Sequence, residues 1–104
     1  MERMPLLSGL QPTHPGELLR EDVLPALGRS KSDIARLLRI SRQHLYDLLE
    51  ERKPITPQMA LRIGKLTGTT AVSWLRMQSA YDLALAEEAT AAELEQIPTL
   101  AASG

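Results

Sequence analysis

Apolar residues recur at helical spacing along five stretches of the chain, and a short polar residue opens each of them. Apolar side chains three or four positions apart fall on one face of an α-helix. No stretch alternates apolar and polar residues over a useful length, which is the pattern of a strand. The sequence therefore predicts an all-α chain whose helices cover residues 13–27, 30–38, 41–51, 56–68 and 70–89.

The ends of these stretches carry residues that begin and end helices. A Ser or Thr side chain at a helix start accepts a hydrogen bond from a free backbone N–H of the first turn. The predicted caps, in chain order, are Thr13, Ser30 or Ser32, Ser41, Thr56, and Thr69 or Thr70. Gly28 and Gly68 mark connections between helices.

The second and third stretches are joined by a very short connection, and the third opens with polar side chains. This is typical of a helix-turn-helix, whose second helix lies in the major groove of DNA with its N-terminal residues facing the base edges. Leu45, Leu48 and Leu49 form the apolar side of the third stretch. The side chains left facing outward or sideways are Arg42, Gln43, His44, Tyr46 and Asp47.

The chemistry of these outward residues suits base recognition. Arg42 can pair with the acceptors of guanine, and Gln43 can pair with adenine. His44 and Tyr46 can touch base edges or phosphates. Asp47 can accept a hydrogen bond from cytosine, or it can orient Arg42 or Gln43. The alternative for each residue is a solvent-exposed position on a helix.

Four residues around the third stretch are candidates for contacts with phosphates: Lys31, Ser41, Arg52 and Lys53. Lys31 lies near the start of the preceding helix, where a positive charge adds to free backbone N–H groups. Arg52 and Lys53 lie just past the end of the third stretch, which we call the reading helix. Arg36 and Arg39 also flank it, but not all of these cations can face one duplex.

The distribution of charge supports a polyanionic partner although the net charge is −1. Residues 29–76 carry ten Lys or Arg against four Asp or Glu. The chain before this segment has a net charge of −2, the chain after it has −5, and no Lys or Arg follows Arg76. A basic middle and an acidic end predict two different partners, or one partner and a solvated end. The alternative is a set of ordinary solvated faces.

Several classes of protein are not expected from this sequence. The absence of cysteine excludes disulfides and cysteine-based zinc sites. No segment has the apolar run of a signal peptide or a membrane span, so we expect a cytoplasmic protein without a membrane partner. There is no glycine-rich phosphate loop, metal cluster or Ser-His-Asp set. His14 and His44 lie at helix starts. We therefore expect neither an enzyme nor a bound cofactor.

The chain is expected to form one folded domain with two less constrained ends. Residues 1–12 are predicted to be flexible, residues 13–90 to form a DNA-binding domain that ends in a dimerisation helix, and residues 91–104 to form an acidic, mobile tail.

The last predicted helix is apolar on more than one side, as expected when a partner covers it. Trp74 and Tyr81 are predicted to lie in the core or beside it. Met77, Ala80 and Ala84 form a second stripe of small or flexible residues, which we expect to contribute to a homodimer seam.

Three segments resemble the HigA-type antitoxins, within the lambda-repressor-like (XRE) helix-turn-helix group. They are "HPGELLREDVLPALGRSKSDIARLLRIS", "ITPQMALRIGKLTGTTAVSWLRMQSAYDL" and the helix between them, so the resemblance runs from His14 to Leu85. It implies a five-helix bundle, a homodimer that binds operator DNA of its own operon, and neutralisation of a HigB-type ribosome-dependent mRNA-cleaving toxin.

The sequence departs from this family at both ends of the reading helix. Arg39 stands where the entering turn commonly has glycine, which adopts a left-handed conformation easily. Glu50 and Glu51 stand where the family often has Asn-Gly. The fold is expected to survive both departures, and they bear on the path of the chain that leads to Arg52 and Lys53.

Other readings stay open. The chain could be a solitary repressor without a toxin, or an interaction module that no longer binds DNA. The toxin-contact surface is open between the acidic tail, which contains Glu87, Glu88, Glu93 and Glu95, and the N-terminal segment with the first helix. A dimer suited to operator DNA should place its two reading helices about 34–36 Å apart.

Overall fold

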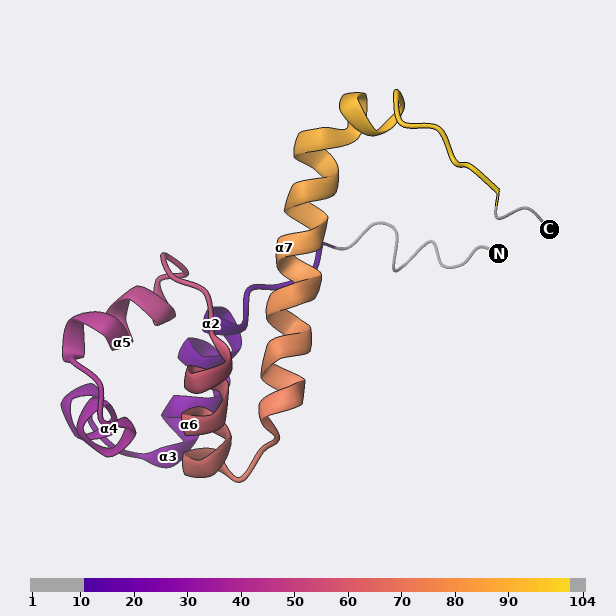
Figure 1. The fold of residues 1–104 in the computed structure, drawn as a ribbon. Coiled ribbons are helices and arrows are strands. Elements are labelled where there is room, and N and C mark those ends of the chain that lie inside the picture. Colours follow the sequence, from indigo (N-terminus) through magenta and orange to yellow (C-terminus); the bar gives the residue numbers. More distant parts are fainter. Residues whose placement is uncertain (1–10, 102–104) are drawn as a thin grey trace.

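The computed structural model describes residues 11–101, which form a bundle of helices with one long helix extending from it (Figure 1). All regular structure in this part of the chain is helical, and the prediction of an all-α, five-helix fold is confirmed. The first helix is continuous and contains α2 (Pro15–Leu18), the π-helical turn η1 (Leu19–Val23) and α3 (Leu24–Leu27). The others are α4 (Lys31–Leu38), α5 (Arg42–Leu49), α6 (Pro57–Thr67) and α7 (Ala71–Leu94).

The start of the first helix differs from the prediction. His14, rather than Thr13, is the N-cap, and its Nδ1 accepts a hydrogen bond from the N–H of Gly16 at 2.9 Å. The cap is buried beneath α7, where the ring of His14 meets Tyr81 edge-on with centroids 5.0 Å apart. The sequence pattern alone favoured a hydroxyl cap, whereas packing selects the imidazole.

The middle of the first helix widens into a π-turn for a local reason. Pro25 has no N–H, and its ring crowds the carbonyl four residues earlier in a regular α-helix. The ladder instead shifts so that the N–H of Leu24 bonds to the carbonyl of Leu19. A π-turn inserts one residue into a turn and redirects the side chains that follow it.

The remaining helices begin at hydroxyl caps, as predicted. Each cap oxygen accepts the N–H of the residue three positions later, at distances of 3.0–3.2 Å. The residues that serve are Ser30, Ser41, Thr56 and Thr70, and this choice settles the two positions where the sequence left alternatives.

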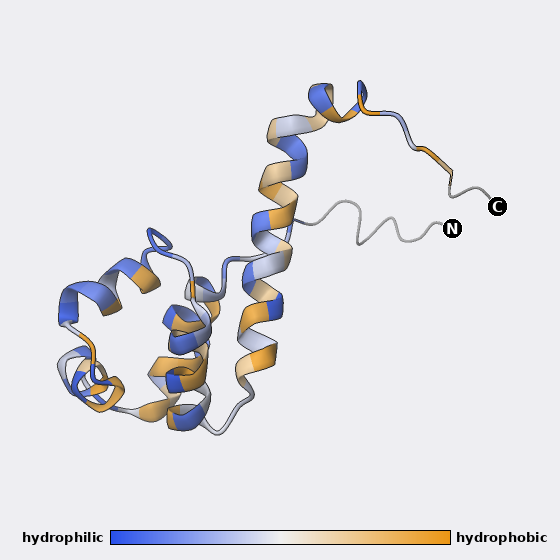
Figure 2. Ribbon diagram, viewed as in Figure 1, coloured by the Kyte–Doolittle hydropathy of each residue, from blue (hydrophilic) through white to orange (hydrophobic). Residues whose placement is uncertain are grey.

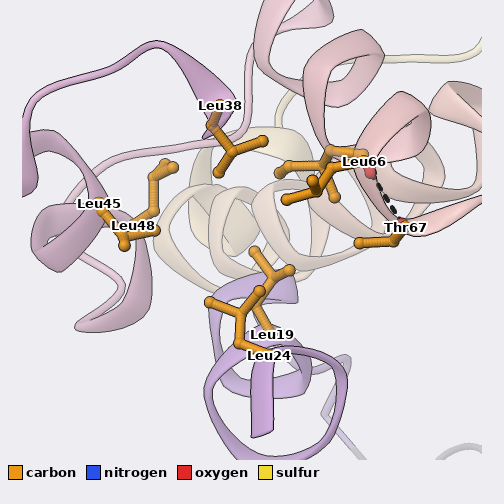
Figure 3. A pocket seen from close by; sticks show the side chains of 8 residues that line it. Leu19, Leu24, Leu38, Leu45, Leu48, Leu66 and Thr67 are labelled. Carbon is orange, nitrogen blue, oxygen red and sulfur yellow. Dashed lines mark hydrogen bonds between the residues drawn. The ribbon is translucent and has the colours of Figure 1, made fainter. Parts of the chain in front are cut away.

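Leucines from four helices meet in the core (Figure 3). Leu19 and Leu24 come from the first helix, Leu38 from α4, Leu45 and Leu48 from α5, and Leu66 from α6. The space left between them and the neighbouring α6 residues is about 10 Å³. That volume is at the lower limit for one water molecule and its walls are apolar, so the core is closely packed.

The start of α7 closes the bundle. Trp74 is buried against the core, and its Nε1 donates to the hydroxyl of Thr69 at 2.7 Å. Gln78 is also buried. Its Oε1 accepts the backbone N–H of Ile55 at 2.8 Å and its Nε2 donates to Asp82 at 3.0 Å. The amide therefore connects α7 to the segment between α5 and α6, a role that has no local signal in the sequence.

The C-terminal half of α7 leaves the bundle (Figure 1). No residue of α7 beyond Gln78 is buried. Hydrophobic and hydrophilic residues are mixed along this extension, as Figure 2 shows. None of the described helices is long and apolar enough to cross a membrane.

Candidate nucleic-acid interface

The helix-turn-helix consists of α4, a short turn and α5. Three leucines fix the orientation of α5 because each is at most 1% exposed: Leu45, Leu48 and Leu49. Arg42, Gln43 and Tyr46 are exposed, whereas His44 and Asp47 are half-buried at the flanks of the helix. The leucine spacing thus turns the N-terminal polar residues of α5 away from the core.

The turn into α5 has the conformation that glycine favours. Arg39 has a φ of 63° and a ψ of 44°. Its N–H bonds to the carbonyl of Arg36 and the N–H of Ile40 bonds to the carbonyl of Ala35, both at 3.0 Å. These bonds close the end of α4 as a glycine would. A left-handed conformation costs a residue with a Cβ roughly 1–2 kcal/mol, which the surrounding structure offsets.

The exit from α5 also contains a left-handed residue, Glu51, whose φ is 63°. The N–H of Glu51 bonds to the carbonyl of Leu48 at 3.1 Å. Arg39 and Glu51 therefore adopt the left-handed backbone that glycine favours, and the fold survives both departures as expected.

On each side of α5, an arginine from another helix contacts the backbone. Arg20 Nη1, on the π-turn, donates to the carbonyl of Leu49 at 2.5 Å and lies 3.3 Å from the carboxylate of Glu51. Arg62 Nη1, on α6, donates to the carbonyl of Leu38 at 2.9 Å. Both guanidiniums satisfy carbonyls that have no partner within their own helix. Neither contact has a local signal in the sequence.

Asp47 joins three of the predicted DNA-contacting residues. Gln43 Nε2 donates to Asp47 Oδ1 at 2.9 Å, Arg52 Nε donates to the same oxygen at 3.1 Å, and Lys53 Nζ lies 3.5 Å from Oδ2. The hydrogen bond from Gln43, followed by the contacts with Arg52 and Lys53, lowers the pKa of the Asp47 carboxyl below its ordinary value. The carboxylate is held in its charged form between the reading helix and the two cations that follow it.

The N-terminal ends of α4 and α5 adjoin one another. Arg42 Nη1 donates to the hydroxyl of Ser32 at 3.4 Å. Lys31 is exposed in the first turn of α4, and Ser41 caps α5 and is also exposed. The structure thus brings Arg42, Ser32, Lys31 and Ser41 to two adjoining helix starts. The sequence predicts Ser32 only as an alternative cap of α4, so its contact with Arg42 is an addition from the structure.

Two other cations of this region are engaged elsewhere. Arg29 Nη1 contacts Asp33 at 2.6 Å, and Arg36 pairs with the other oxygen of the same carboxylate. These contacts, with Arg29 contributing most, lower the pKa of Asp33. Arg36 is therefore an ion-pair partner on the exposed face of α4.

The residues predicted for the homodimer seam lie on α7. Met77 packs partly against the core, Ala84 is half-buried and Ala80 is exposed. Their role between two copies stays a prediction. Within residues 11–101, no cluster of His, Cys, Asp or Glu has the arrangement needed to hold a metal ion.

Comparisons with known proteins find chains that share this fold. No protein-family model matches the chain. The chain is 43% identical over 75 residues to virulence-associated protein I of Dichelobacter nodosus, which covers 72% of this chain and 69% of that protein. It is similar to the antitoxin HigA of Pseudomonas aeruginosa, solved with the higBA promoter, with 36% identity, a TM-score of 0.80, and coverage of 86% of this chain and 99% of that one. It is also similar to the antitoxin GraA in complex with its operator, with 35% identity, a TM-score of 0.81, and coverage of 89% and 95%.

Proposed function

The chain belongs to the HigA-type antitoxins, within the lambda-repressor-like (XRE) helix-turn-helix proteins, and we propose that it binds operator DNA as a homodimer to repress its own operon. The main support for this proposal is the arrangement of side chains on α5. Buried leucines fix one side of this helix while Arg42 and Gln43 are exposed on its first turn. Relatives of the same fold bind a promoter or an operator, which supports the same use of α5 here.

In this proposal Arg42 and Gln43 read base edges, and His44 and Tyr46 contact bases or phosphates beside them. Asp47 acts mainly as a positioning residue, because its carboxylate already accepts a hydrogen bond from the Gln43 amide. That bond leaves the carbonyl oxygen of the Gln43 amide, and the second N–H of its NH₂ group, for adenine.

The proposed phosphate contacts lie on both sides of α5. Lys31 and Ser41 occupy helix starts, where backbone N–H groups add to the attraction for a phosphate. Arg52 and Lys53 follow the helix and are held near it by Asp47. Both ends of the reading helix can thereby be fixed to the DNA backbone, which sets the register of Arg42 and Gln43 on the bases.

Substitutions in the first turn of α5 test the base-reading role. Arg42→Ala and Gln43→Ala should each relax preference at one base position of the operator, at a cost of about 1–3 kcal/mol for the preferred base. The measurement is binding to a panel of duplexes in which each operator position is varied. Arg36→Ala, which removes an exposed arginine paired with Asp33, is the matched control and should leave base preference unchanged. Unaltered preference in both α5 variants would remove α5 from base reading.

We also propose that the chain neutralises a HigB-type toxin in the cytoplasm. Its similarity to antitoxins supports this. The test is copurification with the product of a neighbouring gene for a small basic protein, followed by an mRNA-cleavage assay with and without the antitoxin. The alternative, a solitary repressor, predicts operator binding without a neighbouring toxin gene.

A further inference from the structure

A groove runs between the end of α4 and the middle of α6, on a part of the bundle that the proposed operator contacts do not use. Its volume is about 480 Å³. Two leucines on its walls are exposed, Leu61 at 64% and Leu37 at 38%. Exposed apolar residues that gather in a concave, rimmed surface are typical of an interaction site.

The rim of this groove is basic and its lining contains no acidic residue. Arg39, Arg62 and Lys65 line it. No ion pair joins any of these three to a carboxylate within the described chain, whereas Arg20, Arg29, Arg36, Arg52 and Lys53 all have one. The Arg62 guanidinium is fixed at the rim by the carbonyl of Leu38. Position 39 is an arginine although its backbone is left-handed, a conformation that glycine would adopt at lower cost.

The C-terminal segment, residues 87–100, has the complementary chemistry. It carries Glu87, Glu88, Glu93 and Glu95 and contains no Lys or Arg. Its apolar side chains are uncovered: Leu94 is 49% exposed, Ile97 65% and Leu100 85%. The segment therefore combines an unpartnered apolar surface with unpartnered negative charge.

The segment cannot fill the groove of its own chain in this arrangement. The helix α7 carries it away from α4 and α6, and Figure 1 shows the two regions at opposite ends of the molecule. A second copy has no such restriction. We propose that residues 87–100 of one copy dock in the α4–α6 groove of a second copy, with leucine and isoleucine side chains against Leu37 and Leu61, and glutamates beside Arg39 and Lys65.

Reciprocal docking closes a two-fold dimer, because each copy then offers one groove and one segment. It also covers the exposed residues of both surfaces. This contact adds to the seam proposed on α7 and does not depend on DNA. Its test is therefore done without DNA, so that failure of the groove contact and failure of operator binding are observed separately.

Cross-linking tests which surfaces meet. The chain has no cysteine, so a single introduced thiol is unique. Full-length Leu61→Cys and Ile97→Cys chains, distinguished by tags of different size, are mixed, allowed to exchange and treated with a short thiol cross-linker. The expected product is a mixed dimer in excess of the one formed by Ile97→Cys with the control Glu17→Cys, an exposed position on α2 outside the groove. Equal yields would overturn the proposal, and so would cross-linking of Leu61→Cys only to itself, which would mean that groove meets groove.

Charge reversal tests the electrostatic part. Arg39→Glu/Lys65→Glu should weaken self-association at least roughly tenfold in sedimentation equilibrium, because two attractions in each of the two grooves become repulsions. Adding Glu93→Lys/Glu95→Lys to the same chain should restore it. Arg29→Glu/Arg36→Glu makes the same change in net charge outside the groove and should leave the dimer affinity within about twofold. An unchanged affinity in the first variant, or a loss that the compensating reversal does not restore, would contradict the docking of this segment.

Discussion

Gly16→Ala adds one methyl group where the first helix packs closely against the reading helix. A Cβ at this position would lie 2.1 Å from the carbonyl oxygen of Leu48 and 3.0 Å from Nδ1 of the capping His14. Restoring an ordinary contact of 3.4 Å would require α2 and α5 to separate by about 1.3 Å. The obstacle is backbone of α5, which cannot rotate away as a flexible side chain can.

The sign of the effect distinguishes packing from helix propensity. Propensity alone favours alanine over glycine in a helix by about 0.5–1 kcal/mol. Overpacking a closely packed site costs about 1–3 kcal/mol, and a clash with backbone belongs at the upper end. We therefore expect Gly16→Ala to lower the free energy of unfolding by about 2–3 kcal/mol and the Tm by roughly 10 °C or more.

The assay is thermal and urea unfolding followed by circular dichroism, with Gly28→Ala as the control. Gly28 has a φ of 67° and nothing within 4 Å of an added Cβ, so that variant reports backbone strain without a clash. Its cost should be about 1–2 kcal/mol. A Gly16→Ala protein that melts at or above the temperature of the parent would refute the close approach of α2 to α5.

Three further variants test the packing of the core, the support of α5 by Arg20 and the contacts of Asp47. Leu48→Ala should cost about 2.7–5 kcal/mol in urea unfolding because it opens a cavity in a core with little free volume; a loss below about 1 kcal/mol would mean that the core is loosely packed. Arg20→Met should lower the Tm by less than Leu48→Ala does. It should also weaken operator binding, because the carbonyl of Leu49 and the carboxylate of Glu51 lose their partner at the end of α5. Normal operator binding in this variant would show that Arg20 is not needed to position α5. Asp47 has a lowered pKa when folded, so its stabilising contribution is present above its ordinary pKa and is lost as the pH falls through the lowered value. In Asp47→Asn, the free energy of unfolding should therefore fall less steeply as the pH drops below about 4. The same acid dependence in the variant and the parent would contradict the contacts described for Asp47.

Local sequence patterns predicted the helices and most of their starts. The caps at Ser41 and Thr56 rest on a hydroxyl and an N–H three residues away, so nothing distant is needed to recognise them. The predicted cap at Thr13 was wrong because the competing group, His14, is selected by burial beneath α7 and by its contact with Tyr81. The spacing of the leucines on α5 likewise indicated which of its side chains face outward.

The contacts that hold the reading helix in place could not be read from the sequence. Arg20 lies 29 residues from Leu49, and Arg62 lies 24 residues from Leu38, so only the tertiary fold brings each guanidinium to its carbonyl. The need for glycine at position 16 arises in the same way, from the approach of another helix. The sequence thus supplied candidate side chains for the interface, and long-range contacts determine how they are positioned.

The helix α5 and the cations around it are proposed to bind operator DNA. The most direct test measures the affinity of the full-length protein for the DNA upstream of its own gene, and for a scrambled duplex, between about 50 and 200 mM salt. A dimer that contacts about 6–10 phosphates should lose roughly 10³–10⁵ in affinity over this range. It should also bind the upstream DNA at least about 10³ more tightly than the scrambled duplex. An affinity that is independent of salt and equal for the two duplexes would contradict operator binding through α5.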